Sequence, residues 1–82
     1  MPTQIFFFTQ PGCISCDIVR IFLEAKQIIF EERDMSLEST SRELLEKYHS
    51  HTAPTVVVLT ASGAEVIEGF DPDRLDHLLP AA

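Results

Sequence analysis

Hydrophobic residues change their spacing along this chain, and the changes predict its secondary structure. Residues 5–8 form a short apolar run rich in phenylalanine, which predicts a buried strand over residues 4–9 that ends before Pro11-Gly12. Residues 14–26 then follow a helical period, with apolar side chains at Ile18, Val19, Phe22, Leu23 and Ala25. A strand over residues 28–33 follows without a hairpin signal, so we expect a parallel, right-handed β-α-β unit.

The second half of the chain predicts a helix, two strands and a last helix. We expect the first of these helices over residues 36–48, with Ser36 or Ser39 as its N-cap. A Val-rich strand over residues 55–60 and a short strand over residues 64–67 flank a turn, which predicts a β-hairpin. The last helix begins at Asp71 or Pro72 and runs to residue 79. The order β-α-β-α-β-β-α describes an α/β domain, a four-stranded mixed sheet flanked by helices on both faces.

Length and charge narrow the class of protein. Eighty-two residues, 45% of them hydrophobic, suffice for one small domain with a modest core, spanning residues 1–82. The net charge of −7 disfavours a nucleic-acid partner and allows docking onto a basic patch of a protein, although it can also serve solubility alone. The apolar runs are too short for a signal peptide or a membrane span. We therefore expect a cytoplasmic monomer without a membrane partner.

Cys13 and Cys16 are the only cysteines, and they lie at the start of the first predicted helix. A helix N-terminus presents unpaired N–H groups and partial positive charge, which lower a thiol pKa from about 8.5 to roughly 3.5–7.5. Cys13 is then the candidate nucleophile, and Cys16 is the thiol that resolves a mixed disulfide. The alternatives are an inert pair or half of a zinc site completed by His49 and His51, whose spacing is a poor match. Arg20, one turn further, is either a solvated residue or the partner of a thiolate or carboxylate.

Three motifs in this order make the chain resemble the thioredoxin superfamily and, within it, the glutaredoxins: Cys13-Ile14-Ser15-Cys16, Thr52-Ala53-Pro54-Thr55 and Gly69-Phe70-Asp71. The resemblance covers nearly the whole chain and implies a thioredoxin/glutaredoxin-like fold. It also implies a cis peptide bond before Pro54, with the backbone groups of Ala53 facing an extended substrate.

The same resemblance suggests further substrate-binding residues. In members that use glutathione, the positions of Thr52 and of the turn after the fourth strand hold the tripeptide. Gly69, Phe70 and Asp71 form that turn here. The alternatives are that Asp71 only caps the last helix and that Phe70 belongs to the core.

The stretch Gly69-Phe70-Asp71-Pro72-Asp73 is most similar to the NrdH-type redoxins. These have a glutaredoxin fold, take electrons from a flavoprotein thioredoxin reductase and pass them to a ribonucleotide reductase. The chain departs from ordinary glutaredoxins, because Cys-Ile-Ser-Cys replaces Cys-Pro-Tyr-Cys and Gln10 replaces a lysine that helps to bind a glutathione carboxylate.

The resemblance therefore implies a small dithiol–disulfide oxidoreductase that carries electrons to a protein disulfide, such as that of ribonucleotide reductase. A thioredoxin reductase would recharge it, and no metal or organic cofactor is needed. One alternative is a glutathione-dependent glutaredoxin, with glutathione as co-substrate. Another is a non-catalytic module that binds zinc or an iron–sulfur cluster.

Overall fold

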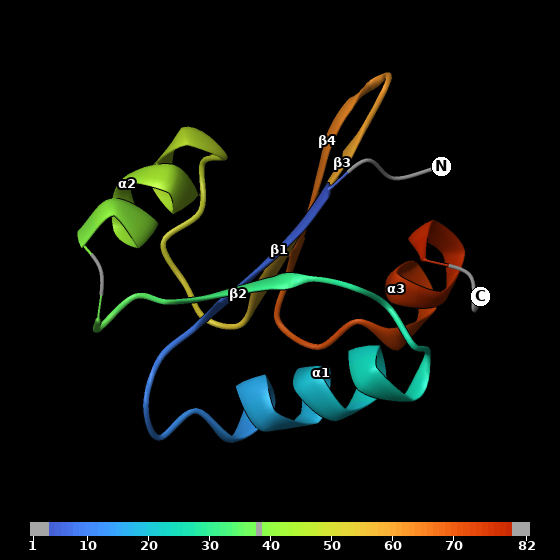
Figure 1. Ribbon diagram of the computed structural model, residues 1–82, viewed down its shortest axis with the longest axis horizontal. Helices are drawn as coiled ribbons and strands as arrows, with labels where there is room; N and C mark the ends of the chain where they lie inside the picture. Colours follow the sequence, from blue (N-terminus) through green and yellow to red (C-terminus); the bar gives the residue numbers. More distant parts are fainter. Residues whose placement is uncertain (1–3, 38, 80–82) are drawn as a thin grey trace.

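The computed structural model describes residues 4–37 and 39–79, in which helices cover both faces of one sheet (Figure 1). The elements follow the predicted order: β1 (Gln4–Thr9), α1 (Ile14–Ala25), β2 (Glu31–Asp34), α2 (Ser39–Lys47), β3 (Thr55–Thr60), β4 (Gly63–Glu68) and α3 (Pro72–Leu78). The strands lie in the order β2-β1-β3-β4. β1 is parallel to β2, whereas the β1–β3 and β3–β4 pairs are antiparallel. The predicted mixed sheet, with its β-α-β unit and its hairpin, is confirmed.

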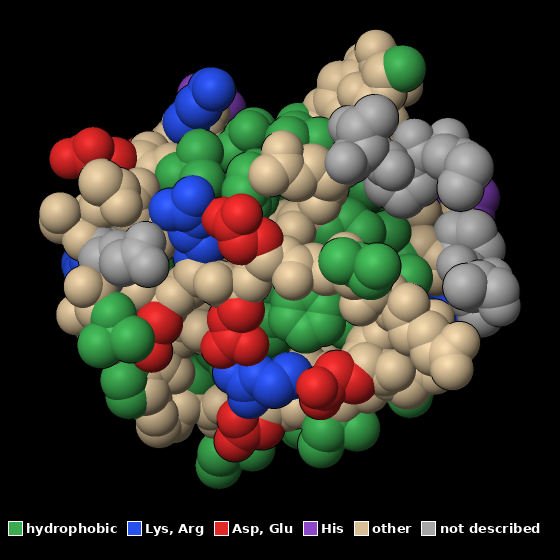
Figure 2. Space-filling view, viewed as in Figure 1, with side chains coloured by type: hydrophobic (Ala, Val, Ile, Leu, Met, Phe, Trp, Pro, Cys, Tyr) green, Lys and Arg blue, Asp and Glu red, His purple; other side chains and the backbone are tan. Residues whose placement is uncertain are grey.

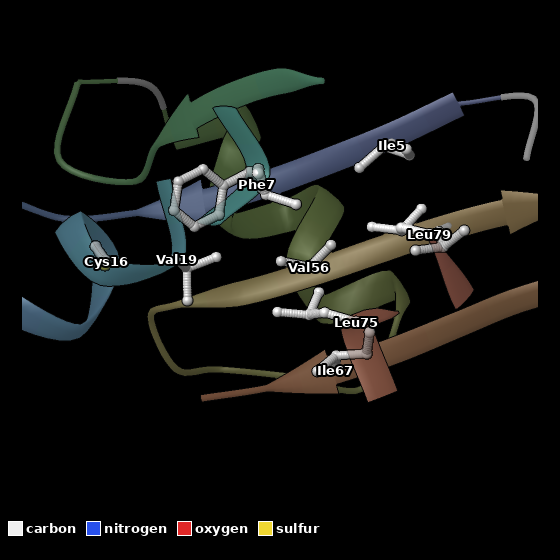
Figure 3. Close-up of a cluster of buried hydrophobic side chains, with 10 residues drawn as sticks. Ile5, Phe7, Cys16, Val19, Val56, Ile67, Leu75 and Leu79 are labelled. Atoms are coloured by element: carbon white, nitrogen blue, oxygen red, sulfur yellow. The ribbon is translucent and has the colours of Figure 1, made fainter. Parts of the chain in front are cut away.

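The two hydrophobic clusters explain why the first strand is apolar at successive positions. Ile5 and Phe7 of β1 point toward α1 and α3, where they pack with Val56, Ile67 and Leu75 (Figure 3). Phe6 and Phe8, together with Val57 of β3, point to the other face and pack against Leu45 of α2. Because β1 and β3 are the inner strands, both of their faces are buried, and alternation of apolar and polar residues is lost.

The second strand was predicted at residues 28–33 but is Glu31–Asp34. The strand begins later because residues 27 and 28 form the turn that ends α1. Gln27 has a φ of 59°, and its N–H donates to the carbonyl of Glu24 at 3.0 Å. The N–H of Ile28 donates to the carbonyl of Leu23 at 3.1 Å. These two bonds form a Schellman motif, which usually has glycine at the position of Gln27. The chain becomes a strand only after this closure.

The second helix was predicted to begin near Ser36, but it begins at Ser39. Ser36 instead lies in a turn, where its N–H and hydroxyl donate to Asp34 Oδ1 at 2.8 and 2.6 Å. The hairpin is longer than predicted, because β4 begins at Gly63. The predicted cap of α3 is confirmed, since Asp71 Oδ1 accepts a hydrogen bond from the N–H of Arg74 at 3.1 Å. No helix within residues 4–37 and 39–79 is long and apolar enough to cross a membrane.

Candidate active site at the Cys13–Cys16 pair

Cys13 and Cys16 are joined by a disulfide at the N-terminal end of α1, with their Cα atoms 5.2 Å apart. Gly12 leads the chain from β1 into the helix with a φ of 73°, a conformation that favours glycine. Cys13 is the N-cap residue and is half-buried, whereas Cys16 is only 1% exposed and belongs to the core (Figure 3). The structure therefore leaves the sulfur of Cys13 as the one that a substrate can reach.

The sulfur of Cys13 takes the place of a capping oxygen. The backbone N–H of Cys16 donates to Cys13 Sγ at 3.0 Å, which is the bond that a Ser or Asp side chain makes at an N-cap. A thiolate accepts such a bond more strongly than a thiol does, so this geometry favours ionisation of Cys13 in the reduced protein. The carboxylate of Asp17 would oppose ionisation, but it pairs with the guanidinium of Arg20 at 2.8 Å.

Arg20 also binds a carboxylate on β2, so it is not merely a solvated residue. Its Nε and Nη2 donate to the two oxygens of Glu32 at 2.9 and 2.7 Å. These bonds raise the pKa of Arg20 and lower the pKa of Glu32. Thr9 Oγ1 donates to the same carboxylate at 3.1 Å, and the guanidinium lies 5.7 Å from the centre of the Phe7 ring. Arg20 thus fixes α1, directly behind the cysteines, against the β1–β2 pair.

The second predicted motif has the backbone that the resemblance implies. The Ala53–Pro54 peptide bond is cis, and Pro54 is buried. Ala53 packs against the same hydrophobic cluster as Cys13. The carbonyl of Pro54 accepts a hydrogen bond from the N–H of Gly69 at 2.8 Å, and Gly69 has a φ of 75°. This bond joins the second and third motifs.

Glu68 holds the loop before Pro54 and was missed by the sequence analysis. Its Oε2 accepts hydrogen bonds from Ser50 Oγ at 2.8 Å and from Thr52 Oγ1 at 3.2 Å. Thr55 Oγ1 in turn donates to the carbonyl of Thr52 at 2.7 Å. Thr55 and Glu68 are partners in the β3–β4 register, so the predicted hairpin could have placed this acid beside the loop. The hydroxyl of Thr52 is therefore shared with the protein's own carboxylate before any substrate binds.

Phe70 and Asp71 follow Gly69 and have different environments. The Phe70 side chain is 42% exposed, yet its ring packs edge-on against Phe22 of α1 at 5.7 Å between centroids. Phe70 is thus both a contact of α1 and an exposed aromatic residue. Asp71 caps α3, as predicted, and lies two residues after Gly69, whose N–H donates to the carbonyl of Pro54.

A small open cavity of about 90 Å³ lies beside Gln10. Arg42 of α2 and His51 also line it. His49, by contrast, closes α2, with a φ of 61° and its N–H donating to the carbonyl of Glu46 at 2.9 Å. Within the described part of the chain, no three His, Cys, Asp or Glu side chains gather as a metal-binding cluster.

Comparison with known proteins agrees with this geometry. Residues 5–60 match the family model of glutaredoxin. The SPbeta prophage-derived thioredoxin-like protein YosR of Bacillus subtilis (strain 168) is 35% identical over 72 residues, which cover 85% of this chain and 86% of YosR. The crystal structure of the thioredoxin-like protein BC3987 is 39% identical, covers 93% of this chain and 100% of its own, and superposes with a TM-score of 0.80. The NrdH-redoxin from Escherichia coli shares the fold with a TM-score of 0.76 at 22% identity, over 98% of this chain and 100% of that redoxin.

Proposed function

The chain belongs to the glutaredoxin family, and we propose that it acts as an NrdH-like redoxin that reduces a protein disulfide and is recharged by a flavoprotein thioredoxin reductase. The family fold and the disulfide-forming pair make it a thiol–disulfide oxidoreductase. One observation carries the proposal: the half-buried Cys13 Sγ caps α1, and Cys16 lies buried one turn behind it.

Two exchange steps would reduce one substrate disulfide. The Cys13 thiolate attacks one substrate sulfur, so that a Cys13–substrate disulfide forms and the substrate's S–S bond breaks. The sulfur that leaves takes up a proton. Cys16 loses its proton and attacks Cys13 Sγ, which releases the second substrate thiol and closes the Cys13–Cys16 disulfide. The protein thereby gives two electrons to the substrate, whose two sulfurs take up from solvent the protons that the Cys13 and Cys16 thiols release on ionisation. No resident metal or organic cofactor is required.

The choice of electron donor depends on Gln10. A neutral amide cannot form the charge-assisted bond that a lysine gives to a glutathione carboxylate, and such bonds contribute roughly 1.5–3 kcal/mol. That loss corresponds to about ten- to a hundredfold in affinity. YosR and BC3987 are both described as thioredoxin-like, which supports a flavoprotein donor for this chain. We further propose that the protein is cytoplasmic and that ribonucleotide reductase is its natural electron acceptor. The proposed substrate-contact residues are Thr52, Ala53, Pro54 and the Gly69–Asp71 turn.

Glutathione is the second candidate donor, and Arg42 is the observation that favours it. Arg42 lines the cavity beside Gln10, and a guanidinium can bind a carboxylate through two parallel hydrogen bonds. If glutathione is the donor, Arg42→Ala should lower turnover with glutathione about tenfold or more. The same substitution should leave turnover with the flavoprotein reductase unchanged.

Side-by-side insulin reduction tests the proposal. One arm supplies NADPH and thioredoxin reductase, and the other supplies NADPH, glutathione and glutathione reductase. We expect faster turnover with the flavoprotein, and no turnover in either arm for Cys13→Ser. Efficient turnover with millimolar glutathione, combined with none in the flavoprotein arm, would assign the chain to the glutathione-dependent glutaredoxins instead.

A further inference from the structure

α1 exposes a row of isoleucines on the face opposite to the core. Ile14, Ile18 and Ile21 are 78%, 44% and 66% exposed. Their spacing of four and three residues places them on one side of the helix, here called the isoleucine face. Figure 2 shows hydrophobic side chains along the edge of the molecule where α1 lies. The core side of the same helix carries Cys16, Val19 and Leu23.

The fold itself gives no reason for the isoleucine face. Exposed β-branched residues favour a helix less than Ala, Glu or Lys would, so these side chains do not stabilise α1. Contiguous exposed apolar surface is typical of interaction sites, whereas single exposed apolar residues are ordinary. Ile29 and Leu37, which are also exposed, lie outside α1 in the connections before β2 and before α2.

We infer that the isoleucine face is the docking surface for the protein whose disulfide exchanges with Cys13, an inference that rests on the proposed function. Ile14 directly follows the N-cap residue Cys13 at the N-terminal end of α1, so a partner that contacts Cys13 Sγ can also extend over the start of the isoleucine face. From Ile14 to Ile21 the row then runs about 10 Å along the helix axis. A partner positioned for exchange can bury all three isoleucines without leaving the reacting sulfur.

Charge around the isoleucine face defines the chemistry of that partner. Asp17 and Glu24 are exposed beside the row, and the side chain of Asp17 is 68% exposed. The only basic residue of α1, Arg20, is already bound by Asp17 and Glu32. The complementary partner is therefore a protein surface with apolar side chains in its centre and Lys or Arg at its rim. A second copy of this chain, with its net charge of −7, or an anionic membrane would meet repulsion instead.

A pair of synthetic peptides tests this inference without any reductase. Each peptide has the same length and one intramolecular disulfide, flanked by Leu and Lys in one probe and by Ser and Glu in the other. The protein is reduced with dithiothreitol, and the dithiothreitol is then removed. The reduced protein is mixed with each probe, and the rate constant of a single turnover is measured. The variants are Ile18→Ser/Ile21→Ser, Glu24→Lys, and Ile29→Ser as the matched control, because Ile29 is 93% exposed but lies off α1. Circular dichroism checks that each variant is folded.

We expect the parent protein to reduce the Leu/Lys probe about tenfold faster than the Ser/Glu probe. Ile18→Ser/Ile21→Ser should lose most of this preference, while Ile29→Ser keeps it. Glu24→Lys should slow the Leu/Lys reaction about threefold, and added salt should slow the parent's reaction with that probe.

Equal rate constants for Ile18→Ser/Ile21→Ser and Ile29→Ser with the Leu/Lys probe would overturn the inference. A parent dimer in sedimentation that Ile18→Ser/Ile21→Ser dissociates would also overturn it, because the occupant would then be a second copy. A parent that reduces neither peptide, nor insulin, would refute the proposed function itself.

Discussion

In the Cys16→Ser variant, the pKa of the Cys13 thiol should lie below its ordinary value near 8.5, because the N-terminus of α1 stabilises the thiolate. The substitution prevents the disulfide but keeps the backbone N–H of residue 16, which lies 3.0 Å from Cys13 Sγ. A hydrogen bond to a charged acceptor contributes roughly 1.5–3 kcal/mol, against about 1 kcal/mol for a neutral one. The helix N-terminus adds about 0.3–1 kcal/mol. Together these favour the thiolate by about 1–3 kcal/mol, which lowers the pKa of Cys13.

Thiolate absorbance at 240 nm, recorded against pH, measures this pKa directly. The same variant unfolded in urea is the internal control, because its Cys13 thiol has lost both the hydrogen bond and the helix and should titrate near 8.5. Folded Cys13 should also react with iodoacetamide at pH 7 several-fold faster than unfolded Cys13. Identical titration curves for the folded and unfolded variant would refute the reasoning.

Three further predictions concern the surroundings of the pair. Glu32→Gln should lower the free energy of unfolding by about 0.2–1 kcal/mol at pH 7, as measured by urea unfolding. This difference should fade as the pH falls below about 4.5, because the folded-state pKa of Glu32 is depressed and the contribution of its carboxylate is lost on protonation. An unchanged difference at pH 3 would contradict this. Leu75→Ala should lower the free energy of unfolding by about 2–5 kcal/mol, since Leu75 is fully buried between α3 and the sheet; a loss under 1 kcal/mol would be inconsistent with that packing. Glu68→Ala should raise KM for insulin a few-fold, because Thr52 and Ser50 lose their acceptor, while iodoacetamide labelling of Cys13 stays unchanged; an unaltered KM would argue against a positioning role.

Much of the fold could be predicted because local signals and burial agree. The apolar run of β1 reflects burial on both sides of an inner strand, and the helical period of α1 places Val19 and Leu23 in the core. The cysteine pair could be placed at a helix N-terminus from its position after Pro11-Gly12. The cis bond before Pro54 required the family resemblance, because the bare sequence favours trans.

The prediction failed where distant or unusual contacts decide the structure. α1 and α2 each close with a non-glycine residue in the left-handed conformation, Gln27 and His49, so no glycine marks these helix ends. The bidentate Arg20–Glu32 pair joins residues twelve positions apart, through a β-α-β arrangement that sets the distance. Glu68 reaches the loop before Pro54 only because the hairpin register places it opposite Thr55. Each of these contacts depends on tertiary structure that no local pattern contains.

Trapping the exchange intermediate tests most directly that Cys13 attacks and Cys16 resolves. Reduced Cys16→Ser protein is mixed with insulin, quenched with acid, and analysed by non-reducing mass spectrometry with peptide mapping. The mechanism predicts a stable insulin adduct linked through Cys13, and no adduct for Cys13→Ser. Reduction of insulin by Cys13→Ser at the parent rate would contradict it. So would an adduct linked through Cys16 in Cys13→Ser at the level that Cys16→Ser forms.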